Sequence, residues 1–186
     1  MRQIHLFEQP DRFVAGTVGA PGERTFYLQA VDGVRVVSVA LEKAQVTVLA
    51  DRMAQLLDEV VARTGTALPP AGEPDTEALA QPVDEEFRVG AMGLAWDGDS
   101  GEVIVEAQAP DEDNDVAEQT LLEDVDEGPD ALRVRLDLSR ARAFVDRARR
   151  VVAAGRPPCP LCGQPLDPAG HVCPRSNGFH RGIALS

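Results

Sequence analysis

All three cysteines of this 186-residue chain lie in one short segment, CPLCGQPLDPAGHVCPRSNG at residues 159–178. Cys159 and Cys162 are separated by two residues and followed by a glycine, which is the spacing of a zinc knuckle whose two thiolates face one ion. His171 and Cys173 are one residue apart, so in an extended segment both side chains point to the same side. The pattern predicts a tetrahedral zinc site formed by Cys159, Cys162, His171 and Cys173.

The identity of the fourth ligand is open to alternatives. His180, which is separated from Cys173 by six residues, competes with His171, and Asp167 or a water ranks third. We favour His171 because the shorter loop closes at a lower entropic cost. Four protein ligands would make the site structural, since a catalytic zinc keeps one position open. Zinc would then order a C-terminal tail that is too short and polar to build its own core, and a reduced tail without metal is the alternative.

Few other residues suggest chemistry. His5 is the one histidine away from the C-terminal segment, and we interpret it as a structural or exposed residue of an N-terminal strand. The sequence contains no Gly-x-Ser-x-Gly, P-loop or HExxH motif. Carboxylates crowd together at Asp111, Glu112, Asp113 and Asp115, but they lack the burial that separates a general acid from a general base. We therefore expect no catalytic residue and no enzyme.

Charge is distributed unevenly along the chain, whose formal net charge is −13. Residues 97–130 hold 14 acidic and no basic side chains, whereas residues 140–186 hold eight arginines and two aspartates. At helical spacing, most of one outward face is basic, formed by Arg140, Arg142, Arg147, Arg149, Arg150 and Arg156. This arginine face is a candidate surface for an acidic protein or a nucleic acid, and a solvated helix face is the alternative reading.

An internal repeat supplies the elements that must position these groups. RFVAGTVG at 12–19 resembles EFRVGAMG at 86–93, and VSVALEKAQVTVLADR at 37–52 resembles LRVRLDLSRARAFVDR at 132–147. In the second pair an alternating apolar strand is followed by an amphipathic helix. We expect Gly65 to end the first helix, and Ser139 to cap and Gly155 to stop the second. The predicted class is α+β, with two tandem antiparallel β-meander-plus-helix units related by a pseudo-twofold axis.

The expected boundaries follow from this repeat. Residues 1–65 form the first unit, 66–85 a proline-rich linker, 86–156 the second unit and 157–186 the zinc-binding tail. An acidic loop at 110–130 has no aromatic residue and too little apolar surface to order itself, so we expect it to be mobile. No apolar run could span a bilayer and no signal peptide is recognisable, so we expect a cytoplasmic protein with reduced thiols.

Four segments carry a resemblance to a known family. They are HLFEQPDRFVAGTVGAPGERTFYLQA, VSVALEKAQV, EEFRVGAMGLAWDG and GRPPCPLCGQPLDPAGHVCPRSNG. They are similar to an uncharacterised actinobacterial family, domain-of-unknown-function family 3090, and the last segment is the most specific. In this family the histidine of GHVCPR belongs to the motif, whereas the position of His180 commonly holds other residues. The resemblance therefore supports His171 as the fourth ligand, and it implies no established enzymatic activity.

These features together favour a non-enzymatic cytoplasmic zinc-binding protein that acts as a protein-interaction adaptor or regulator. Its partner would be another protein, and no membrane is implied. The alternative is a nucleic-acid-binding protein that uses the zinc tail and the arginine face. The overall negative charge argues against general nucleic-acid binding, while the basic C-terminal part keeps it open.

Overall fold

The computed structural model describes residues 1–111, 120–155, 158–166 and 170–175. Its first half contains β1 (Ile4–Glu8), β2 (Arg12–Val18), β3 (Thr25–Asp32), β4 (Arg35–Leu41) and α1 (Lys43–Thr64). Its second half contains β5 (Glu85–Arg88), β6 (Ala91–Asp97), β7 (Glu102–Gln108), β8 (Ala131–Leu136) and α3 (Leu138–Ala153). Among the described helices, none is both long and apolar enough to cross a membrane.

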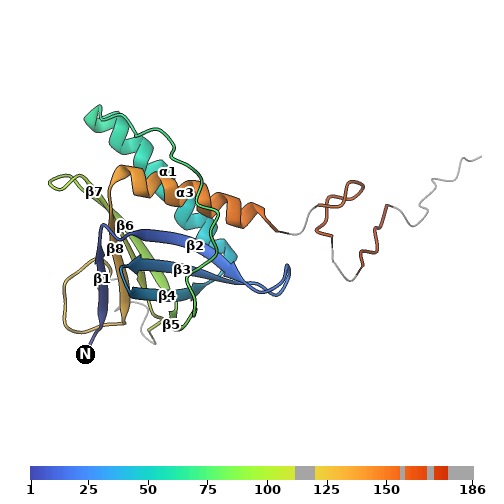
Figure 1. Ribbon diagram of the computed structural model, residues 1–186, viewed down its shortest axis with the longest axis horizontal. Coiled ribbons are helices and arrows are strands. Elements are labelled where there is room, and N and C mark those ends of the chain that lie inside the picture. Colours follow the sequence, from blue (N-terminus) through green and yellow to red (C-terminus); the bar gives the residue numbers. More distant parts are fainter. Residues whose placement is uncertain (112–119, 156–157, 167–169, 176–186) are drawn as a thin grey trace, which may run out of the picture.

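The strands form two four-stranded sheets, in the orders β2-β3-β4-β5 and β1-β8-β7-β6 (Figure 1). Three strands of each sheet are an antiparallel meander, as predicted. The fourth strand is parallel and comes from the other half, because β5 pairs with β4 and β1 pairs with β8. The α+β class with two meander-plus-helix units is confirmed, but each sheet is mixed rather than antiparallel. The reason is that β4, α1 and β5 form a crossover connection, which returns the chain in the same direction.

The strand registers define which residues of the two halves correspond. In one sheet Phe13, Ala30 and Val37 form a row across β2, β3 and β4. In the other sheet the matching row is Met92, Ala107 and Leu132. The helices follow the same correspondence, since Val46, Leu49, Ala50 and Met53 of α1 take the positions of Ala141, Phe144, Val145 and Ala148 of α3, and all eight are buried. The predicted match of residues 37–52 with 132–147 is therefore confirmed.

The predicted match of RFVAGTVG with EFRVGAMG is wrong. Gly16 lies in β2, whereas Gly90 lies between β5 and β6. The two glycines also serve different close contacts: a Cβ at Gly16 would lie 2.5 Å from the side chain of Leu79, and one at Gly90 would lie 2.6 Å from the backbone of Pro110. Two short glycine patterns thus arose from unrelated packing constraints.

The caps of the two helices agree with the sequence in part. Gly65 ends α1 in the left-handed conformation, with φ of 68°. The N-cap of α3 is Asp137, whose carboxylate accepts from the backbone N–H of Arg140 at 2.8 Å. The expectation that Ser139 caps this helix is wrong, because Asp137 already fills the position and Ser139 lies within the first turn.

Buried apolar side chains of both sheets and both helices form one core. Figure 1 shows α1 and α3 together on the same side of the sheets. The ring of Phe13 stacks on that of Phe144, with centroids 4.8 Å apart, and so joins β2 to α3. Leu28, Val39 and Val134 are fully buried in the same core. The two halves therefore share their hydrophobic stabilisation and exchange a strand.

The predicted linker is packed against the protein over residues 69–81, which we call the strap. The Asp75 carboxylate accepts from Arg12 at 2.7 and 2.9 Å and from Arg147 at 2.8 Å. Arg147, which is buried, also donates to the backbone carbonyl of Glu77 at 2.7 Å. The hydrogen bond from Arg12, opposed by burial and supported by the charge of Arg147, lowers the pKa of Asp75. The strap is therefore held by charge-assisted hydrogen bonds.

Further along the strap, Leu79 and Ala80 are held by apolar packing and by hydrogen bonds with a buried amide, and not by charged groups. Leu79 is buried against Gly16, where a larger residue would collide with it. The side chain of Gln29, fully buried on β3, donates to the carbonyl of Ala80 and accepts from its N–H. The predicted proline-rich linker is therefore packed on the protein at these residues, because the sheet offers them fixed donors, an acceptor and a gap.

Residues 120–130, the second half of the predicted acidic loop, cover the other sheet. Arg2 donates to the carbonyls of Thr120 and Glu123 at 3.1 and 3.0 Å. A Cβ at Gly93 would lie 2.8 Å from the side chain of Leu121, so the segment packs closely on β6. The expectation of a mobile loop is wrong for residues 120–130, and residues 112–119 lie outside the described part of the chain.

A buried charge cluster fixes this covering segment. Glu106 on β7 is fully buried and pairs with Arg2 at 2.6 Å and with Arg133 at 2.5 Å. Gln108 donates to the same carboxylate at 2.7 Å. Arg133 also reaches Asp124, which belongs to the covering segment. One buried carboxylate therefore compensates two guanidinium groups, and these in turn bind the backbone of residues 120–123.

Replacing Glu106 tests how much the cluster contributes. Glu106→Gln should lower the free energy of unfolding by about 3–5 kcal/mol, because it leaves the buried Arg2 without a counter-charge and leaves Arg133 with Asp124 alone. The matched control is Glu102→Gln on the same strand, since Arg135 is partly exposed and keeps its second partner Asp97 at 2.5 Å. That change should cost less than about 1 kcal/mol. Equal losses in urea titrations would contradict the proposed difference.

Replacing Asp75 tests whether the strap is held locally. In Asp75→Asn, amide hydrogen exchange of residues 72–80 should be at least about tenfold faster, because hydrogen bonds to a charged group are lost. Exchange in β3 should be unchanged. In the native chain, the stabilisation is present above the ordinary carboxyl pKa and is lost as pH falls through the lowered pKa of Asp75. Asp51→Asn, which removes an exposed pair with Arg149, is the control. Unaltered strap exchange in Asp75→Asn would show that these bonds are dispensable.

Candidate metal centre and adjoining cavity

A tight turn presents the first two cysteines. The N–H of Gly163 donates to the carbonyl of Cys159 at 2.8 Å, and the N–H of Cys159 donates to the carbonyl of Gln164 at 2.7 Å. Gly163 has φ of 73°, a conformation that other residues rarely adopt. The glycine after Cys162 therefore does what the sequence pattern suggests, and it lets both sulfurs face the same point.

The second pair of residues closes on this turn. The Sγ atoms of Cys159 and Cys173 are 3.8 Å apart, and Nε2 of His171 is 3.2 Å from Sγ of Cys162. All four ligand atoms lie within 4.8 Å of one another. The structure thus brings together the four side chains singled out in the sequence, while His180 and Asp167 lie outside the described residues.

These separations match the dimensions of a tetrahedral metal site. With a zinc–sulfur bond of about 2.3 Å, two thiolates of a tetrahedron are about 3.8 Å apart, and a thiolate and an imidazole nitrogen about 3.6 Å. The cluster can therefore hold a metal ion. Three sulfurs and one nitrogen are a donor set that suits zinc. An ion bound by all four protein atoms would have a filled tetrahedron and no position for a substrate.

The local electrostatics show why an ion would stabilise the cluster. Hydrogen bonds from the backbone N–H groups of Cys162 and Leu161 lower the pKa of Cys159. At Cys162 a hydrogen bond from the N–H of Gln164 favours the thiolate, but burial and the neighbouring Cys159 sulfur outweigh it and raise the pKa. An ionised Cys159 thus hinders the ionisation of Cys162, and a divalent cation would remove this repulsion.

The described residues around the cluster, 158–166 and 170–175, form what we call the hook. Its interior is small, since Cys159 and Cys173 are buried while Cys162 and His171 are partly exposed. Two apolar side chains point outward, with exposed fractions of 54% for Leu161 and 78% for Val172. These two side chains are the candidate contact residues of the hook.

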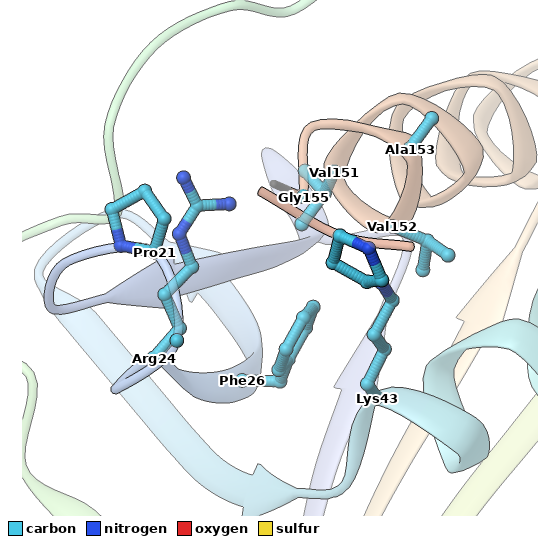
Figure 2. A pocket seen from close by; sticks show the side chains of 10 residues that line it. Pro21, Arg24, Phe26, Lys43, Val151, Val152, Ala153 and Gly155 are labelled. Carbon is cyan, nitrogen blue, oxygen red and sulfur yellow. The ribbon is translucent and has the colours of Figure 1, made fainter. Parts of the chain in front are cut away.

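A cavity of about 530 Å³ lies where α3 ends, and Pro165 of the hook contributes to its wall. Figure 2 shows Arg24 and Lys43 on either side of Phe26, with the end of α3 above them. Arg24 donates to the carbonyl of Ala154 at 2.7 Å. Among the described residues, no acidic side chain lines the cavity. Sequence reasoning missed this site, because its residues come from a hairpin turn, two helix ends and the hook.

The arginine face expected on α3 is not a free anion-binding surface. Its described arginines all donate to oxygen atoms of the chain itself: Arg140 to Pro10, Arg142 to Pro69, Arg147 to Ala15, Arg149 to Asp51 and Arg150 to Asp75. Most of these acceptors belong to the strap or to β2 and its approach. The helix therefore uses its cations to fix neighbouring segments, and Arg156 lies outside the described residues.

The remaining histidine, His5, is partly buried on β1, opposite Leu132 of β8. It lies on a different element from the hook and from the residues of the cavity. Of the crowded carboxylates in the sequence, Asp111 is half-buried, and Glu112, Asp113 and Asp115 lie outside the described residues. Among the described residues, the metal cluster is thus the arrangement with the clearest chemical character.

Comparison with known proteins gives one match. No curated protein and no solved structure matches the chain. The family described as "Protein of unknown function (DUF3090)" matches residues 5–173, a range that begins in β1 and ends at Cys173, the last cysteine of the cluster. The match confirms the resemblance seen in the sequence, and this chain therefore belongs to the DUF3090 family.

Proposed function

We propose that this protein is a non-enzymatic adaptor whose hook, ordered by one structural zinc ion, binds another protein. The observation that carries the proposal is the closed Cys3His cluster, with four ligand atoms within 4.8 Å and two exposed apolar side chains beside it. A closed site has no open position at which zinc could activate water or polarise a substrate. Thiolate ligands also suit the reducing cytoplasm, where cysteines are available for metal binding.

The hook has the properties of a small recognition element. The free energy of zinc binding would order a segment that cannot form a core of its own, and so would hold Leu161 and Val172 in fixed positions. Arg175 supports the turn from the other side, because it donates to the carbonyl of Leu161 at 3.1 Å. Rigid apolar side chains lose little entropy on binding and are effective contact residues.

The nucleic-acid alternative has less support than it had from the sequence. Phosphate binding would require free cations, and the described arginines of α3 are bound to oxygens of the chain. Arg175 at the hook is one exposed cation, which is too little for a phosphate track. We therefore prefer a protein partner.

Metal analysis tests the zinc site. We expect one zinc per chain in protein purified without chelators, held by Cys159, Cys162, His171 and Cys173. Cys162→Ser and His171→Ala should each lose most of the metal, because removing one ligand opens the tetrahedron. Metal content is measured by mass spectrometry of the native protein. Full retention in His171→Ala together with loss in His180→Ala would reassign the fourth ligand.

A second experiment tests the adaptor role. Leu161→Asp/Val172→Asp should retain zinc but lose a partner protein that the native chain captures from nuclease-treated lysate, because the apolar contact surface is destroyed. Val34→Asp is the matched control, since Val34 is fully exposed at the distant turn between β3 and β4. Capture of the same partner by the double variant would overturn the proposal. Recovery of nucleic acid that falls steeply with added salt would favour the alternative.

A further inference from the structure

The two-fold repeat gives the anchoring groove of the strap a counterpart on the other half of the molecule. The strap is anchored between β2 and α3, in a groove lined by Phe13, Val14, Ala143 and Arg147. The corresponding residues, from the strand registers and the helix alignment, are Met92, Gly93, Val48 and Arg52. These four residues, with Leu49 and Leu94, line a separate groove of about 230 Å³ between β6 and α1. The two halves of the molecule therefore correspond in their surface grooves as well as in their fold.

The two grooves differ in what occupies them. In the first, Arg147 is buried and donates to Asp75, to the carbonyl of Glu77 and to the carbonyl of Ala15. In the second, Arg52 is exposed and forms no hydrogen bond or ion pair with any described residue. Val48, beside it, is 54% exposed. The counterpart groove thus presents a cation and an apolar wall that have no partner within the described part of the chain.

The strap shows what kind of ligand such a groove accepts. It is an extended segment whose aspartate meets the arginine, whose backbone carbonyls accept further hydrogen bonds, and whose leucine packs on the sheet. The lining of the counterpart groove contains no acidic residue, although the chain carries a net charge of −13. In addition, β6 is the last strand of its sheet, so its outer edge lacks a strand partner among the described elements.

We propose that the groove between α1 and β6 binds a short, extended acidic segment of a partner protein. A carboxylate of that segment pairs with Arg52, and an apolar side chain packs between Val48 and Met92. The counterpart of Arg12 is Ala91, so the groove offers one arginine where the carboxylate of Asp75 in the strap meets two. The site is separate from the hook, and this proposal does not depend on zinc.

The strap sequence itself supplies the probe. A labelled peptide GEPDTEALAQP, residues 72–82, is titrated into the full chain, and binding is followed by fluorescence anisotropy and by methyl chemical shifts. We expect shifts at Val48, Met92 and Leu94. Arg52→Ala should weaken binding by up to about fivefold, the effect of a partly exposed ion pair. Arg63→Ala, an exposed arginine at the end of the same helix, is the matched control and should leave affinity unchanged.

A double-mutant cycle makes the test specific. Replacing the peptide aspartate by asparagine should weaken binding to the native chain but not to Arg52→Ala, because both changes remove the same pair. The proposal fails if the peptide does not bind, if Arg52→Ala binds it equally well, or if the shifts map to Val14 and Leu79, which would mean exchange with the strap. It also fails if Arg52→Ala instead abolishes a concentration-dependent self-association, since the occupant would then be a second copy.

Discussion

The exchange of one parallel strand between the two halves is the constraint on which the rest of the structure depends. Because β5 must pair with β4 after α1 has crossed the molecule, the chain between them has to run across the outside of the first sheet. That path is the strap. In the same way β1 pairs with β8, which brings Arg2 next to Glu106 and to residues 120–123. The two covering segments are thus consequences of one topological feature.

The two halves anchor their covering segments at corresponding positions with different chemistry. Gln29 and Ser38 are bonded to each other on the outer face of one sheet, and Glu106 and Arg133 are paired in the same row of the other. Because Gln29 and Ser38 are neutral, the charged contacts with the strap come from arginines of β2 and α3, which bind Asp75. The charged pair instead holds its segment from within the sheet. A common fold therefore supports two local solutions, and the grooves beside them need not have the same occupant.

Sequence reasoning succeeded where the signal was local and failed where distant residues decide the outcome. The alternation of Val37, Val39 and Leu41, the helical periodicity and the cysteine spacing depend on neighbours in the chain, so the fold class and the metal cluster could be predicted. The order of residues 69–81 and 120–130 depends on Arg147 and Arg2, which come from elements far away in sequence. An arginine-rich helix and an acidic, proline-rich stretch looked solvated separately, because nothing in either one identifies the other as its partner.

The two candidate surfaces of the protein also differ in the source of their order. The groove between α1 and β6 is formed by elements of the shared core, so its geometry follows from the fold itself. The hook lies beyond α3, and its order rests on four ligand atoms around one point. In the proposed zinc-bound hook, Leu161 and Val172 would be held by metal affinity rather than by hydrophobic burial. Two surfaces with independent sources of order can engage partners under different conditions, which is a physical basis for an adaptor that brings two proteins together.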